Sequence, residues 1–83
     1  MSKTFRNRLI LEIKERISRE NENLEALQRK AIVLANRFAM FDEEDVSFRR
    51  TFTNWRLRKT RDAIWDVKLV IEGLESRLEM LTQ

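Results

Sequence analysis

Several residue types are missing from this 83-residue chain, and each absence excludes a class of structure or chemistry. There is no proline and only one glycine, Gly73, so turn-forming residues are scarce and an all-α fold is expected. The lack of cysteine excludes a disulfide framework and thiolate chemistry. The lack of histidine removes the commonest general base and metal ligand.

Long apolar runs are also missing. No stretch approaches the roughly 20 apolar residues that a membrane-spanning helix needs. Residues 1–20, MSKTFRNRLILEIKERISRE, carry charge throughout and contain no signal-peptide core. We therefore predict a cytoplasmic protein with no transmembrane segment.

The known catalytic signatures have no counterpart in the chain. There is no Gly-rich phosphate loop, no nucleophile–base set and no zinc-ligand cluster. The segment KERISRENENLEALQRKA (residues 14–31) resembles the first helix of the helical chorismate mutases in its Leu, Glu and Arg spacing. Amphipathic helices in general share that spacing, and the Arg and Lys positions on which such an enzyme depends are not matched. We predict a protein that is not an enzyme and holds no cofactor or metal.

Apolar residues recur at alternating steps of three and four in both halves of the chain. Such steps bracket the 3.6-residue helical turn, so these side chains share one helical face. In the first half the stripe consists of Ile10, Ile13, Ile17, Leu24, Leu27, Ala31, Leu34, Phe38 and Phe41, with Glu20 as its polar member. In the second half it consists of Leu57, Ile64, Val67, Ile71, Leu74, Leu78 and Leu81, with Thr60 as its one polar member. The pattern predicts one domain, residues 1–83, built as a long antiparallel, coiled-coil-like helical hairpin.

The segment FDEED (residues 41–45) predicts where the chain turns. Asp42 is a good N-cap, and the acids at 43–45 suit a first helical turn, where free amides and the helix dipole favour negative charge. We therefore predict a first helix over about 3–40, a turn at 41–43 and a second helix over about 43–82. The poor helix formers of TFTN (residues 51–54) leave open a break within that segment.

Some apolar residues lie off the stripe. At 100° per residue, Trp65, Leu69 and Met80 fall on the far side of the second helix, and Gly73 lies near the edge of that face. An apolar back face on a thin hairpin is typical of contact with another chain. We predict that Trp65, Leu69 and Gly73 serve self-association into a homodimeric four-helix bundle. The alternative is a monomer whose helices bend and wrap these side chains.

The segment SFRRTFTNWRLRKTR (residues 47–61), called the basic segment below, concentrates positive charge. It holds six cations and no acid, whereas the rest of the chain has 11 basic and 14 acidic residues. Phe48, Phe52 and Trp55 are interleaved with the cations. The candidate partner-binding residues are Arg49, Arg50, Phe52, Trp55, Arg56, Arg58, Lys59 and Arg61.

The basic segment allows three interpretations. Its cations form no single helical stripe, which fits a solvated face and disfavours a groove-reading DNA helix. Phosphate contacts and aromatic stacking would suit sequence-nonspecific binding of nucleic acid. Arg and Trp dominate protein-binding hot spots, so an acidic protein surface is the third partner class. We predict a small protein-interaction module, a regulator or inhibitor of a larger acidic target, with nucleic-acid binding as the alternative.

Overall fold

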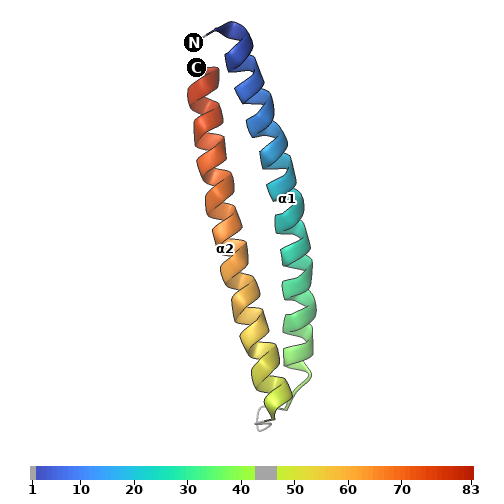
Figure 1. Cartoon of the computed structure of the whole chain (residues 1–83). Coiled ribbons are helices and arrows are strands. Elements are labelled where there is room, and N and C mark those ends of the chain that lie inside the picture. The colour runs from blue at the N-terminus through green and yellow to red at the C-terminus, as the bar shows by residue number, and fades with distance from the viewer. Residues whose placement is uncertain (1, 43–46) are drawn as a thin grey trace.

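A computed structural model of the chain describes residues 2–42 and 47–83. It consists of two helices, α1 (Lys3–Ala39) and α2 (Phe48–Thr82). The helices run antiparallel and pack along their length, with the connection at one end and both termini at the other (Figure 1). The predicted all-α hairpin is confirmed.

Helix α1 has a well-defined end at each terminus. The Ser2 hydroxyl accepts a hydrogen bond from the Phe5 amide at 3.2 Å, as an N-cap does. At the other end, the Met40 and Phe41 amides donate to the carbonyls of Arg37 and Phe38, each at 3.2 Å. These three-residue bonds tighten the last turn and use carbonyls that the helix leaves free.

The start of α2 corrects the sequence-based prediction. The N-cap is Ser47, whose backbone is extended (φ −63°, ψ 155°) and whose hydroxyl accepts from the Arg50 amide at 3.4 Å. Asp42 is therefore not the cap, and the helix begins at Phe48 instead of about residue 43. Serine and aspartate are comparably good caps, so local propensity does not distinguish Ser47 from Asp42, and the prediction of Asp42 was wrong. The predicted roles of residues 43–45 lie outside the described residues.

The predicted stripes of α1 and α2 face each other within the hairpin, and each is called an inner stripe below. All their members are buried or half-buried, including Glu20. The buried apolar side chains are Ile13, Leu34, Leu57, Ile71 and Leu74. Each helix buries one face only, so the core is a single seam between two rods.

No break occurs within residues 51–54, since α2 is helical through them. Thr53 and Asn54 are half-buried there, so packing against α1 outweighs their weak helix propensity. Thr60 is buried in the inner stripe, and its hydroxyl donates to the Arg56 carbonyl at 2.8 Å. That bond satisfies the one polar side chain buried among the described residues.

Arg6 ties the open end of the hairpin together. Its Nε donates to the Leu81 carbonyl at 2.6 Å and its Nη2 to the Gln83 carbonyl at 3.0 Å. The last turn of α2 has no basic residue of its own. A guanidinium from the neighbouring helix therefore satisfies the free carbonyls at the negative end of the α2 dipole.

The hairpin is long and thin, with principal extents of 63 × 16 × 15 Å. Its radius of gyration is 18.7 Å, against about 12 Å for a compact chain of this length. Within the described residues, neither helix is long and apolar enough to cross a membrane.

Candidate protein-interaction surface

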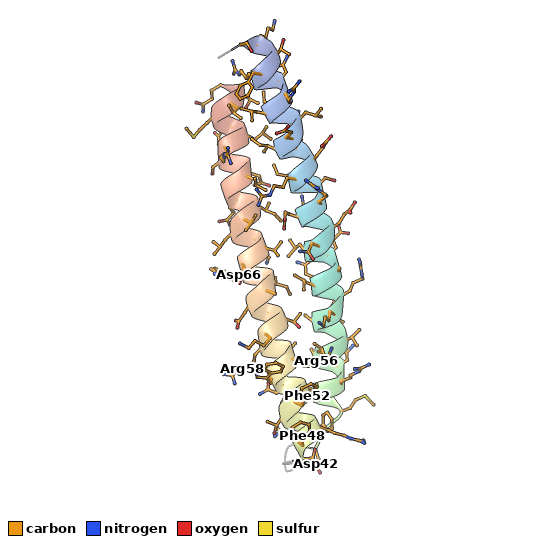
Figure 2. All side chains as sticks on the ribbon, viewed as in Figure 1. Asp42, Phe48, Phe52, Arg56, Arg58 and Asp66 are labelled. Atoms are coloured by element: carbon orange, nitrogen blue, oxygen red, sulfur yellow. The ribbon has the colours of Figure 1, made fainter. Side chains whose placement is uncertain are left out.

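An aromatic ladder runs along the first two turns of α2. The rings of Phe48 and Phe52 have centroids 5.7 Å apart, and those of Phe52 and Trp55 are 5.9 Å apart, both pairs being stacked. The steps of four and three residues place the rings one above another on the helix surface. Figure 2 shows Phe48 and Phe52 at the turn end of the hairpin. All three rings are exposed, Phe48 by 79% and Trp55 by 53%. The ladder is an apolar surface that the hairpin itself does not cover.

Two cations of the basic segment lie over this ladder. The Arg56 guanidinium is 5.9 Å from the Phe52 ring centroid, and the Lys59 ammonium is 6.0 Å from that of Trp55. These distances are at the outer limit of cation–π attraction, which is worth roughly 0.5–1 kcal/mol at exposed sites. The rings hold the two long side chains against the helix, so less of their freedom is lost when a partner binds.

A shallow groove lies beside the ladder, between the two helices. Its cations are Lys30 of α1 and Arg56 and Lys59 of α2, and Trp55 forms one wall. The remaining lining residues are Leu27, Thr60 and Ala63, so the groove contains no acid. Its volume, about 220 Å³, is below the roughly 300–1,000 Å³ typical of small-ligand pockets. The groove has room for one or two side chains of a larger partner.

The cations of the groove continue toward the turn. Helical residues seven apart lie on nearly the same face, which places Arg37 beside Lys30 on α1 and Arg49 beside Arg56 on α2. Arg37 and Arg49 are exposed. We call these four residues together with Lys59 the basic flank.

The structure separates the other predicted partner-binding cations from the basic flank. Arg50 is half-buried, with its guanidinium 5.1 Å from the ring centroid of Phe38 on α1. Arg58 lies on the side of α2 away from α1, whereas Arg56 lies on the α1 side (Figure 2). Arg61, exposed, is about 140° round the helix from Arg56.

The predicted self-association residues lie along the back of α2. Trp65 is 65% exposed and Leu69 49%, so the alternative in which bent helices wrap these side chains is wrong for the hairpin. Gly73 is exposed on the same helix, and a Cβ added there would meet nothing within 4 Å. The close packing for which a helical glycine is useful is therefore not found inside the hairpin.

Sequence reasoning missed two residues of the basic flank on α1, Arg37 and Lys30, of which Lys30 lines the groove. Lys30 lies outside the basic segment and joins the groove only because the hairpin register brings α1 residues 27–30 beside α2 residues 55–63. The inner stripes gave the signal that could have found it, since aligning them antiparallel from the turn sets this register.

Among the described residues, no three potential metal ligands lie close enough to hold an ion. The basic flank places permanent positive charge beside the exposed ring of Trp55. Comparison of the chain with protein-family models, curated proteins and solved structures finds no match.

Proposed function

We propose that the protein is a small, non-catalytic interaction module that binds an acidic surface of a larger protein through the basic flank and Trp55. The observation that carries the proposal is the acid-free groove, in which cations from both helices converge beside an exposed Trp. Arg and Trp are the residue types that most often dominate protein-binding hot spots. Occupying such a surface on a target would make the module a regulator or inhibitor.

The stacking of the ladder favours a protein partner over nucleic acid. Phe52 has a ring neighbour on each side and the Arg56 guanidinium above it, and Trp55 has Phe52 and Lys59. Binding of single strands relies on open ring faces for the bases. Here the chain's own side chains occupy part of the surface of Phe52 and Trp55, which leaves less of these rings open to a stacking base. An acidic protein needs only the cations and the ring edges.

The proposal includes self-association through the back of α2. The hairpin exposes 6779 Å², against about 5,300 Å² for a compact protein of its mass. Two hairpins therefore expose roughly 3,000 Å² more surface than two compact proteins of the same mass. A stable interface buries about 1,200–2,000 Å² in total, so this extra surface is large enough to form one. Trp65, Leu69 and Gly73 lie away from the groove cations Lys30 and Arg56, so pairing leaves those cations free.

Charge reversal on matched flanks tests the partner site. The test variant is Lys30→Glu with Arg56→Glu, and the control is Lys14→Glu with Lys68→Glu, which makes the same charge change on the opposite flank, one residue in each helix. The probe is a labelled helical peptide with Glu and Leu on one face, followed by fluorescence anisotropy. We expect the test variant to weaken binding at least tenfold and the control to weaken it less than threefold. Equal losses in the two variants would contradict the proposed site.

A nucleic-acid arm separates the two partner classes. A random DNA duplex and a single-stranded RNA are titrated at about 50 and 200 mM salt, where six phosphate contacts would lower affinity roughly 10³-fold. Tight binding with that salt dependence, together with no binding of the acidic peptide, would overturn the protein-partner proposal in favour of nucleic acid.

A further inference from the structure

Charge is unevenly distributed along α2. Residues 48–61 hold six cations and no acid, whereas residues 62–82 hold five acids and two cations. The first part therefore carries a net charge of +6 and the second −3. Both parts also present uncovered apolar side chains, the ladder in the first and Trp65 and Leu69 in the second. The two parts of α2 thus carry opposite net charge, and both expose apolar side chains, so they are complementary to each other.

The outer face of α2 has the spacing of a second helical seam. Phe48, Phe52, Trp55 and Lys59 are followed at the same steps of four and three by Asp62, Asp66, Leu69 and Gly73. Every member of this series is exposed. A series with this spacing can pack along a second helix in the way the inner stripe does.

We propose that two copies pair antiparallel through the outer faces of α2, so that the basic segment of each copy lies against the acidic part of the other. The proposal rests on the self-association proposed above and adds its orientation and register. A parallel pairing would instead set the six cations of one copy against the six of the other, which costs electrostatic energy. The row of α1 that faces away from the inner stripe, Arg8, Glu15, Glu22, Arg29 and Asn36, is charged or amide throughout. The apolar side chains that α1 exposes, Phe5, Leu11, Ile32 and Val33, do not follow one another at steps of three and four.

Charge and size complementarity together fix the register. In an antiparallel pair, each step forward on one helix is a step back on the other. Placing Lys59 opposite Asp62 of the second copy sets Phe52 opposite its Leu69 and Phe48 opposite its Gly73. The open space at Gly73 then receives the most exposed ring of the ladder. The two-fold axis passes beside Lys59 and Asp62, where Trp55, Arg58, Lys59 and Asp62 line a hollow on the outer face.

The first experiment establishes the pair itself. Sedimentation is measured for the wild-type chain and for the Trp65→Ser, Leu69→Ser double variant from micromolar to millimolar concentration. We expect a dimer for the wild type and a monomer for the variant, with unchanged helical content by circular dichroism. A wild-type monomer throughout would overturn both the self-association and the antiparallel pairing. It would leave the groove proposal standing, because the peptide titration tests that separately.

Cysteine cross-linking then tests the orientation, since the chain has no cysteine of its own. Phe48→Cys and Gly73→Cys chains are oxidised separately and as a mixture. In the antiparallel pair, position 48 of one copy lies about 37 Å along the helix from position 48 of the other (25 residues at 1.5 Å). A disulfide needs Cα atoms within about 7 Å. We therefore expect a cross-link in the mixture and in neither chain alone. Cross-linking of Phe48→Cys chains alone, or no cross-link in a proven dimer, would overturn the orientation.

A charge exchange tests the register. Lys59→Asp or Asp62→Lys alone places like charges opposite each other twice per dimer, and we expect either change to raise the dissociation constant about tenfold. The double variant restores opposite charges at both places, so its dissociation constant should return to within about threefold of the wild-type value. A double variant weaker than either single variant would contradict the register. Trp55 and Lys59 belong to both proposed surfaces. The peptide titration instead varies Lys30 and Arg56, which lie outside the dimer seam, so the two proposals can fail independently.

Discussion

The two helices of the hairpin differ on the side that faces away from the inner stripe. In each helix, one row of exposed residues spaced seven apart runs along that side. In α1 the row is polar throughout: Arg8, Glu15, Glu22, Arg29 and Asn36. In α2 three of its five members are apolar: Phe48, Trp55, Asp62, Leu69 and Ser76.

This difference supports the proposal that α2 makes a second contact. A helix with one apolar stripe needs one neighbour, whereas an apolar surface on its far side calls for another. Helix α1 also exposes apolar side chains, Phe5, Leu11, Ile32 and Val33, but none of them lies in its outer row. Helix α2 packs on α1 and still exposes Trp55, Trp65 and Leu69. The proposed interaction surfaces therefore belong mainly to α2, with Lys30 and Arg37 as the contributions of α1.

The largest expected effect comes from truncating one leucine on each side of α2. Leu57 is 4% exposed and Leu69 49%. At a concentration where the chain is monomeric, we expect Leu57→Ala to lower the free energy of unfolding by about 2–3 kcal/mol and Leu69→Ala by less than about 1 kcal/mol. Urea denaturation followed by circular dichroism measures both. Above the dimer dissociation constant, the cost of Leu69→Ala should grow, because association stabilises the folded chain. If Leu69→Ala lowers the free energy of unfolding by the same amount at all concentrations, Leu69 does not contribute to association.

The next effect concerns two arginines of α1 that lie on different faces. Arg6 donates to the Leu81 and Gln83 carbonyls, whereas Arg8 is exposed in the outer row. We expect Arg6→Ala to cost about 1–2 kcal/mol, because two charge-assisted bonds and a cap of α2 are lost. The matched Arg8→Ala should cost less than about 0.5 kcal/mol. Amide hydrogen exchange in the last turn of α2 should accelerate in the Arg6 variant alone. Equal exchange rates in the two variants would contradict a stabilising role of the Arg6 hydrogen bonds.

The smallest effect has the opposite sign and depends on the dimer. Gly73 is helical and exposed, and an added Cβ meets nothing within the hairpin. We expect Gly73→Ala to stabilise the monomer by about 0.5–1 kcal/mol, since alanine restricts the unfolded chain more than glycine does. In the dimer, the new methyl group would occupy the space proposed for Phe48 of the second copy, so association should weaken. Thermal unfolding at low concentration and sedimentation at high concentration separate the two effects. Stabilisation with unchanged association would count against a role of Gly73 in the interface.

Much of the candidate site was readable from the sequence, but its grouping was not. The exposed back of α2 followed from helical periodicity, and the three aromatic residues of the ladder were visible among the cations of the basic segment. Lys30 was missed because it reaches the groove from the other helix. Arg50 could not be told from its exposed neighbours until its guanidinium was placed against Phe38.

By itself, the sequence determined the hairpin. The chain has no proline and a single glycine, so both halves form long helices. Each helix has one apolar stripe, and the simplest way to bury both stripes is to pack them against each other. Only the tertiary structure decided that Ser47, not Asp42, begins α2, that Arg6 closes the open end, and that Lys30 joins Arg56 and Lys59 around one groove. These features depend on the register between two helices and on a choice between rival caps. Local propensity leaves both undecided, because neither is a property of a single segment.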